Sequence, residues 1–307
     1  MTVERLPLLY VLSNGRSGST LVELLVGNHP RAWTVGEVQV LPHDVADAAA
    51  SCGCGVPVAA CSFWNTVLDG FDVVHERALL TQFRATRNHG KVLRAEHLRD
   101  LLRGRVAPSR RSRAAAYAEH SRDLLERVRT EASRRRGGPV DLVVDASKDP
   151  YRLLWLADSG LFDLRVVHLV KDPRAFVHSM VRTKERPHAS EVLRLSGRWA
   201  VENLAMDRLV RGALPAENVR RVRYEDLAGD PRGTLVELGA WLGLDFPADW
   251  HEGAFRGPES HAISGNATRF RAGGVRLDER WREQSPAWVR RATWLATAPT
   301  RIALGKR

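Results

Sequence analysis

The chain has 307 residues and a formal net charge of +11, a size that fits one α/β domain with a large core, or such a core with an inserted region. No stretch reaches the roughly 20 apolar residues that a membrane-spanning helix needs, so a membrane-spanning class is excluded. The basic residues are mostly Arg and cluster over residues 94–136 without interleaved aromatic residues. The charge therefore favours an anionic small molecule over nucleic acid as a partner.

The first predicted elements are a strand, a tight turn and a helix. The segment LLYVL at residues 8–12 predicts a buried strand, and apolar spacing over 19–27 predicts a helix. We interpret the N-terminal segment as this strand and not as a signal peptide, because it lacks a small-residue cleavage site, and a cytoplasmic location is the simplest expectation.

The turn between them, residues 14–20, reads NGRSGST and predicts an anion site. The free N–H groups of the first helical turn point toward the anion, and Gly15 and Gly18 let a ligand approach the backbone closely. Side chains add a forked cation and hydroxyl donors, which are Arg16, Ser17, Ser19 and Thr20. A phosphate is the expected ligand. The turn is not that of a nucleotide triphosphatase, because Ser19 stands where G-x-x-x-x-G-K-[ST] has Lys.

Residues 31–83 show few long periodic segments and predict an irregular excursion that holds all three cysteines, Cys52, Cys54 and Cys61. Their C-x-C-x6-C spacing offers three thiolates, and a structural zinc site wants four ligands, so His43 or His75 is a candidate fourth. The alternative is that all three are reduced, unbound thiols, and this is the interpretation we favour. Neither reading gives a metal a part in catalysis.

The rest of the chain predicts alternating helices and strands. Helical spacing covers residues 84–136 and stops at Gly137-Gly138-Pro139. Strands are predicted at 140–145, 164–170 and 218–223, with a helix at 153–158. Strands that alternate with helices predict a parallel sheet with the ligand at the carboxyl ends of the strands.

Three further motifs follow those strands. They are KDPRAFVHS at 171–179, DASKDPY at 145–151 and YEDL at 224–227, and a glycine-containing loop near the C-terminus carries SGNATRFRAGG at 264–274. Together with RSGSTL at 16–21 and NHP at 28–30, in this order, they resemble the motifs of sulfotransferases that use 3′-phosphoadenosine 5′-phosphosulfate (PAPS). The match is closer to the bacterial, carbohydrate and tyrosylprotein branches, and it extends over residues 8–290.

The resemblance implies an α/β, P-loop-like three-layer fold with a central parallel sheet. It implies a single sulfotransferase domain over 1–307, with a core at 1–37 and 140–290 and an inserted, Cys-containing and helical substrate-side region at 38–139.

The resemblance also implies residue roles in cofactor binding. The turn from Arg16 to Thr20 would hold the 5′-phosphosulfate. Lys171, in place of the usual Arg, and Ser179 would bind the 3′-phosphate, Tyr224 would lie near the adenine, and the C-terminal loop would add Arg269 and Arg271. Lys keeps the charge of Arg but loses its fork.

The expected catalytic groups are a base and cations. Glu37 follows the NHP motif as the general base does in tyrosylprotein members, with His43, Glu96 and His97 as reserves. Lys148, with Arg16, would stabilise charge on the leaving group.

The predicted function is therefore sulfuryl transfer from PAPS to the hydroxyl of an unidentified small-molecule or glycan acceptor, with no metal required. One alternative is an ATP- and magnesium-dependent small-molecule kinase with Asp172 as a metal ligand. The other is a basic nucleotide-binding protein without catalysis.

Overall fold

The computed structural model describes residues 4–75, 95–182, 187–253, 260–265, 270 and 274–305, and the side chains of 95–97 and 253 are not described. Five strands form one parallel sheet in the order β2-β3-β1-β4-β5. Their bounds are β1 Leu6–Ser13, β2 Ala32–Gly36, β3 Leu142–Asp145, β4 Phe162–Val170 and β5 Val219–Arg223. The sequence predicted four of them. It missed β2, a short segment with little alternation that is buried along its whole length.

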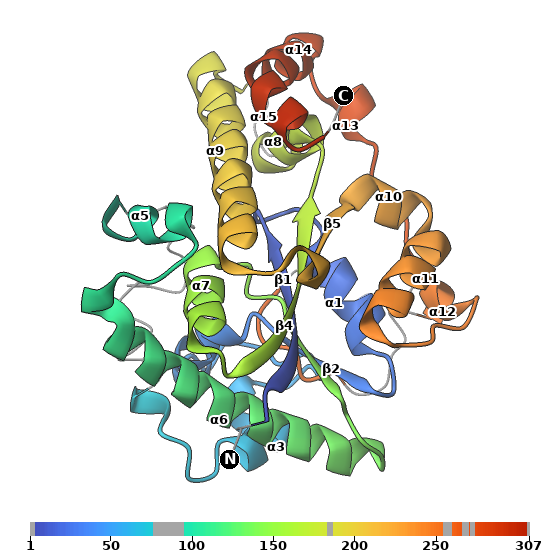
Figure 1. Ribbon diagram of the computed structural model, residues 1–307. Helices are drawn as coiled ribbons and strands as arrows, with labels where there is room; N and C mark the ends of the chain where they lie inside the picture. Colours follow the sequence, from blue (N-terminus) through green and yellow to red (C-terminus); the bar gives the residue numbers. More distant parts are fainter. Residues whose placement is uncertain are drawn as a thin grey trace.

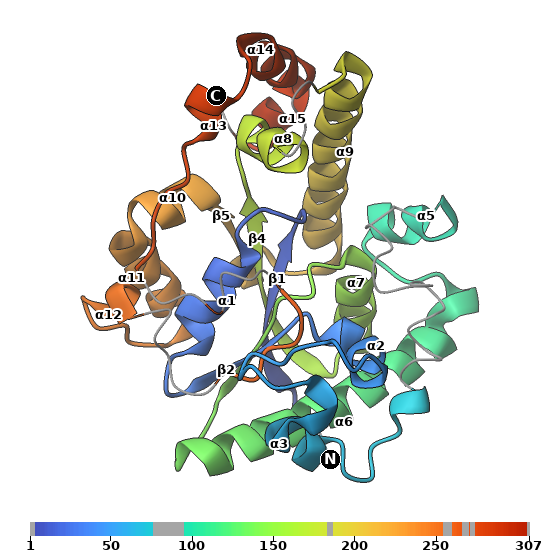
Figure 2. The ribbon, with the colours of Figure 1, turned by 180° about the vertical axis from the view of Figure 1, so that it is seen from behind.

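Helices cover both faces of this sheet (Figures 1 and 2). Leu9 and Val11 of β1 pack with one set, which is α1 Ser19–Gly27, α10 Tyr224–Gly229 and α11 Pro231–Leu242. Leu8, Tyr10 and Leu12 point the other way and pack with a second set, α6 Arg111–Arg136, α7 Pro150–Ser159 and α9 Ala189–Ala213. The alternation of β1 thus fixes a three-layer α/β fold, as predicted.

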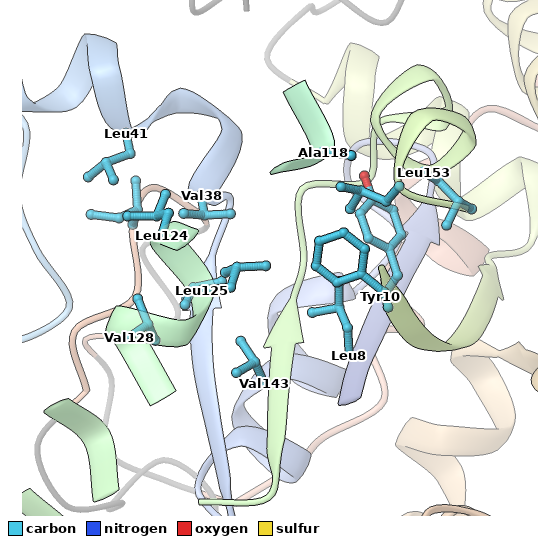
Figure 3. Close-up of a cluster of buried hydrophobic side chains, with 14 of the residues drawn as sticks. Leu8, Tyr10, Val38, Leu41, Ala118, Leu124, Leu125, Val128, Val143 and Leu153 are labelled. Carbon is cyan, nitrogen blue, oxygen red and sulfur yellow. The ribbon is translucent and has the colours of Figure 1, made fainter. Parts of the chain in front are cut away.

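The region predicted as an insertion shares the core of the sheet. Leu124, Leu125 and Val128 of α6 pack in the same cluster as Leu8 and Val143, and Figure 3 shows them beside Val38 and Leu41. The other helices of this region are α2 Leu41–Ala46, α3 Ser62–Val67 and α5 Ala95–Arg103.

The C-terminal helices pack at the other end of the molecule. These helices are α14 Ala287–Ala296 and α15 Ala298–Ala303. Val289 of α14 and Leu304, which follows α15, pack in one cluster with Phe176 of α8 Pro173–Val181 and Trp199 of α9. Two further short helices are α12 Trp250–Gly253 and α13 Trp281–Gln284. Among the described helices, none combines the length and the apolarity that crossing a membrane would require.

Two helix starts show how local sequence fixes the loops at the sheet edge. Helix α7 begins at Pro150, three residues before its predicted start, because the Asp149 carboxylate caps it by accepting from the Tyr151 backbone N–H at 2.9 Å. Helix α8 begins in the same way, with Asp172 accepting from the Arg174 N–H at 2.8 Å and Pro173 at the first position.

Candidate active site

The predicted anion turn lies between β1 and α1. Its backbone is unusual at two positions, Arg16 with φ 65° and Gly18 with φ 91°. Such conformations in a non-glycine residue concentrate at functional sites. The Arg16 side chain is exposed, whereas the Ser17 hydroxyl is fully buried and has no hydrogen-bond partner in the described part of the chain. A buried donor of this kind suits a phosphate or sulfate oxygen.

The start of the turn is anchored by a helix that carries none of the predicted motifs. Asn14 is buried and donates from Nδ2 to the Glu202 carboxylate of α9, and its Oδ1 accepts from Asn203 Nδ2. Glu202 also accepts from Arg198 Nε at 2.8 Å. This polar network holds the end of β1 against α9. Sequence analysis missed it, because three polar residues on a long helix carry no motif.

Tyr224 and Lys171 meet beside the anion turn. A Cβ placed on Gly18 would lie 2.3 Å from Tyr224 Cδ2, so only glycine lets the tyrosine ring pack this closely. The Lys171 ammonium lies 4.3 Å from the centre of the same ring. Residues that follow β1, β4 and β5 are thereby brought together, as predicted.

The environment of Lys171 shifts its pKa. Burial lowers the pKa of this amine, and the carboxylates of Glu225, Asp278 and Asp172 oppose that shift. Burial also raises the pKa of Tyr224. Lys171 is therefore a buried cation that loses its proton more easily than a surface lysine does.

Asp172 and Ser179 are already engaged in local structure. Both carboxylate oxygens of Asp172 bind Arg174, at 3.0 Å to Nε and 2.7 Å to Nη2. The Arg174 guanidinium lies 4.5 Å from the centre of the Trp281 ring and 4.1 Å from that of Trp294. The Ser179 hydroxyl donates to the Phe176 carbonyl at 2.7 Å, so it offers an incoming ligand a proton only by leaving that carbonyl.

Glu37 and Lys148, predicted separately, form an ion pair. Lys148 Nζ donates to Glu37 Oε1, and the side chains are 10% and 19% exposed. Lys148 has φ 62°, an uncommon conformation for a lysine. Gln39 Nε2 donates to the Ser147 carbonyl at 2.8 Å and so ties the two segments together. The pair lies just beyond the paired residues Gly36 and Asp145 at the ends of β2 and β3.

Buried polar contacts hold the turn that carries Lys148. Asp145 and Arg152 form an ion pair at 2.9 Å whose side chains are 0% and 1% exposed. Asp145 also accepts from the Ser147 N–H at 2.8 Å, and the Tyr10 hydroxyl donates to the Asp149 carbonyl at 2.8 Å. Removing one member of such a pair leaves a buried charge without compensation, so the turn is rigidly specified.

The segment with Glu37 is held from the other side by the loop at 260–263. Glu37 N donates to the Ile263 carbonyl at 2.8 Å, and Ile263 N donates to the Val35 carbonyl at 3.0 Å. A Cβ on Gly36, which has φ 68°, would lie 2.3 Å from the Ile263 carbonyl oxygen. A glycine at this position is what allows the loop to pack against the segment that carries Glu37.

Some predicted residues are not placed. Arg269 and Arg271 lie outside the described residues, as do the side chains of Glu96 and His97. Their assignments remain predictions. His43 lies on α2, in the segment that follows Glu37.

The candidate groups lie along the edge of the sheet that is formed by the carboxyl ends of the strands, and they follow the order of the strands. Ser13 pairs with Leu169, and Val170 pairs with Arg223, so β1, β4 and β5 end at nearly the same level. Reading along the order of the strands, the edge carries Glu37, Lys148, the anion turn, Lys171 and Tyr224. A carboxylate and an amine thus stand at one end, and a cation on an aromatic ring at the other, with an anion turn between them.

Comparisons with known proteins identify the family of the chain. The sequence model described as "Sulfotransferase family" matches residues 71–248, which include Lys148, Lys171 and Tyr224 but not the anion turn or Glu37. The chain is 37% identical to carbohydrate sulfotransferase 5 of Mus musculus over 107 residues, which are 29% of this chain and 27% of that protein.

Two solved structures share the fold. The sulfotransferase domain from the curacin biosynthetic pathway has a TM-score of 0.56 at 16% identity, covering 99% of both chains. The sulfotransferase domain from the Synechococcus PCC 7002 olefin synthase has a TM-score of 0.55 at 20% identity, covering 99% of this chain and 97% of that one.

Proposed function

Because the chain belongs to the sulfotransferase family, we propose that it transfers the sulfuryl group of PAPS to a hydroxyl group of a small-molecule or glycan acceptor. The observation that carries the proposal is the order of groups along the sheet edge. Glu37 and Lys148 follow β2 and β3, the anion turn follows β1, and Lys171 and Tyr224 follow β4 and β5. This matches the order acceptor hydroxyl, sulfuryl group, 5′-phosphate, and then 3′-phosphate and adenine.

In this scheme Glu37 is the general base. Its carboxylate takes the proton of the acceptor hydroxyl while the acceptor oxygen forms a bond to sulfur. The bond from sulfur to the bridging phosphate oxygen breaks, and adenosine 3′,5′-bisphosphate leaves. The Glu37 carboxylate is held in place by the Lys148 ammonium and by the backbone bond to Ile263.

Lys148 stabilises the leaving group. As the bond to sulfur breaks, negative charge develops on the bridging oxygen, and an ammonium group at this place offsets it. The amine reaches Glu37 before the substrate binds, so it is oriented toward the reacting groups in advance. Arg16 and the N–H groups of residues 17–20 hold the 5′-phosphosulfate.

At the other end of the edge, Lys171 recognises the 3′-phosphate and Tyr224 supports the adenine. Recognition of a 3′-phosphate is what separates PAPS from ATP. The kinase alternative is not favoured, because both oxygens of Asp172, its proposed metal ligand, bind Arg174.

The proposal names two classes of acceptor. The similarity to a carbohydrate sulfotransferase extends over 29% of this chain and supports a glycan hydroxyl as one candidate. A small molecule with an alcohol or a phenol is the other.

Calorimetric titration with adenosine 3′,5′-bisphosphate and with ATP, each with and without magnesium, tests the cosubstrate. We expect the bisphosphate to bind without metal and at least about tenfold more tightly than ATP, a difference of about 1.4 kcal/mol. Binding of ATP that requires magnesium, with no binding of the bisphosphate, would favour the kinase. Mass spectrometry of PAPS incubations with glycan and phenol libraries then identifies the acceptor, and binding without any turnover would favour the non-catalytic alternative.

A further inference from the structure

Three cysteines and a histidine converge below the candidate active site. Their ligand atoms, from Cys52, Cys54, Cys61 and His261, all lie within 4.8 Å of one another. Cys52, Cys61 and His261 are buried, and Cys54 is exposed. The sequence analysis favoured reduced, unbound thiols, and for the zinc alternative it named His43 or His75 as the candidate fourth ligand. The structure instead brings in His261 from the C-terminal loop.

The spacing of these atoms resembles a tetrahedral metal site. Zinc bonds of about 2.3 Å to sulfur and about 2.0–2.1 Å to nitrogen, set at tetrahedral angles, separate two sulfurs by about 3.8 Å and sulfur from nitrogen by about 3.6 Å. Cys54 Sγ and Cys61 Sγ are 3.8 Å apart, and Cys52 Sγ lies 3.6 Å from His261 Nδ1. The third contact, Cys61 Sγ to His261 Nδ1, is 3.1 Å and would open slightly around an ion.

The ligands are fixed by their surroundings. The His261 ring stacks on Phe63 with centroids 4.8 Å apart, and the His261 carbonyl accepts from Trp64 Nε1 at 2.8 Å. Cys52 is paired with Ile263, and the Gly53 N–H donates to the Ala262 carbonyl at 3.0 Å. The thiols and the imidazole are thus held in place by contacts that do not depend on a metal.

The charge around the cluster suits three thiolates. Zn²⁺ with three thiolates and one neutral imidazole carries a net charge of −1. Arg135 lies beside it, with Nη1 3.3 Å from His261 Nε2. Bonds to Glu131 at 2.7 Å and to Ser62 at 2.9 Å hold the guanidinium there. When Nδ1 of His261 binds a metal, Nε2 carries the ring proton and no longer accepts a bond from Arg135. Arg135 then keeps its bonds to Glu131 and Ser62 while its contact with Nε2 loosens.

We propose that Cys52, Cys54, Cys61 and His261 bind one structural zinc ion. All four ligands come from the protein, which is typical of a closed structural site and not of a catalytic one. The ion would fasten the 52–61 segment to the C-terminal loop. Since Ile263, two residues after His261, accepts the bond from the Glu37 N–H, the ion would also support the segment that carries the base. The proposal does not depend on which reaction the protein catalyses.

The main competing state is a disulfide. A disulfide would use two of the three thiols and leave the third cysteine and His261 without a role. The Cys54 and Cys61 sulfurs are a van der Waals contact apart at 3.8 Å, whereas a disulfide requires about 2.05 Å.

The test is metal content and cobalt spectroscopy of the full-length protein. Protein purified under reducing conditions from zinc-supplemented cells should contain about one zinc per chain by elemental analysis. After zinc removal, Co²⁺ should give a sulfur-to-cobalt charge-transfer band and the strong visible bands of a tetrahedral site, saturating at one equivalent and reversed by Zn²⁺. Less than about a tenth of an equivalent of zinc, together with no charge-transfer band, would overturn the proposal. So would one free thiol per chain without metal, since that indicates a disulfide.

Variants assign the ligands. Cys54→Ser changes an exposed side chain, so the core is preserved, and His261→Asn removes the nitrogen ligand. Each should weaken zinc binding at least about 100-fold in competition with a chromophoric chelator. His75→Asn is the matched control, an exposed histidine that the sequence alone had made a candidate ligand, and it should bind as the wild type does. If His75→Asn weakens binding as much as His261→Asn, the assignment of His261 is wrong. If a variant fails to fold, the cobalt spectrum of the wild type still decides.

Discussion

At the scale of single residues, the contact between Glu37 and Lys148 organises the candidate active site. Neither residue lies in a helix or a strand. Glu37 is held by the backbone bond to Ile263 of the C-terminal loop, and the turn with Lys148 is held by the bond from Gln39 to Ser147. A base and a cation in contact allow one group to take a proton while the other offsets charge on the leaving group.

Replacement of either residue should slow the chemical step more than it weakens nucleotide binding. We expect Lys148→Ala to lower kcat by about 10²–10³-fold and Glu37→Gln by about 10²–10⁴-fold. The Kd for adenosine 3′,5′-bisphosphate should change only a few-fold, because this product lacks the sulfuryl group. Sulfated product measured against time, with calorimetry for Kd, separates the two effects.

The double variant, with Glu37→Gln and Lys148→Ala, tests whether the two residues act in the same step. If both residues act in one step, its loss of kcat should be smaller than the product of the two single losses. Wild-type kcat in the Glu37→Gln variant would instead remove Glu37 as the base and return His43, Glu96 and His97 to consideration.

Lys171 predicts a pH dependence of nucleotide binding. Since burial lowers its pKa, the ammonium that would bind the 3′-phosphate is present at low pH and is lost as pH rises through that lowered pKa. Bisphosphate affinity should therefore start to fall in the pH range below about 10.4, the pKa of an ordinary lysine.

Lys171→Arg is the matched variant, because a guanidinium keeps its charge throughout this range. Its affinity at neutral pH should equal or exceed that of the wild type, and it should change less with pH. Calorimetric titrations across the range measure both. A loss of more than about tenfold at neutral pH, ~1.4 kcal/mol, would rule out Lys171 as the ligand of the 3′-phosphate.

At the scale of secondary-structure elements, each part of the site follows a strand and most parts precede a helix. Helix caps fix where these turns end, as Asp149 does for α7 and Asp172 for α8. The anion turn is capped differently, by Gly18 in the left-handed conformation with no side-chain bond. No capping side chain therefore occupies the start of α1, which suits an anionic ligand there.

Gly18 and Gly15 make a matched pair for testing this turn. A Cβ at Gly18 would meet Tyr224 at 2.3 Å on a backbone with φ +91°, whereas one at Gly15 would have no atom within 4 Å. Gly18→Ala should lower the free energy of unfolding by about 1–3 kcal/mol, and Gly15→Ala should change it by less than about 0.5 kcal/mol. Denaturant unfolding measures both. Equal effects would mean that the close approach of Tyr224 does not constrain the turn.

At the scale of the whole molecule, the helical region predicted as an insertion is part of the main core. Helix α6 lies across one end of the molecule and covers the sheet through Leu124, Leu125 and Val128 (Figures 1 and 3). Two further α6 residues, Tyr117 and Ser121, accept hydrogen bonds from the Arg152 guanidinium of α7. The same guanidinium pairs with Asp145, which holds the turn that carries Lys148. Helix α6 and the turn that carries Lys148 thus share one packing unit.

This arrangement predicts a large effect of core truncation in α6. Leu125→Ala should lower the free energy of unfolding by about 2–5 kcal/mol, since Leu125 is fully buried against the sheet. Leu102→Ala, on helix α5, removes a leucine that is 44% exposed and should cost less than about 0.5 kcal/mol. A Leu125→Ala variant as stable as Leu102→Ala would show that α6 does not belong to the core. Thermal and denaturant unfolding provide the measurement.

The sequence by itself determined the features that depend on neighbouring residues. The turn from Asn14 to Thr20 between a strand and a helix, and the Pro-initiated helix after β4, arise from backbone preferences that act within a few residues. The parallel α/β class followed from the alternation of such elements.

Only the tertiary structure decided which distant residues meet. Lys148 contacts Glu37 across 111 residues, Asn14 contacts Glu202 across 188, and Cys61 contacts His261 across 200. The first contact depends on β2, which pairs with β3 at the edge of the sheet, and β2 was missed because its five residues carry no periodicity. The third turned an incomplete trio of thiols into a set of four ligands. Such contacts are set by sheet order and by packing between layers, and these are properties of the folded chain that no local pattern of residues encodes.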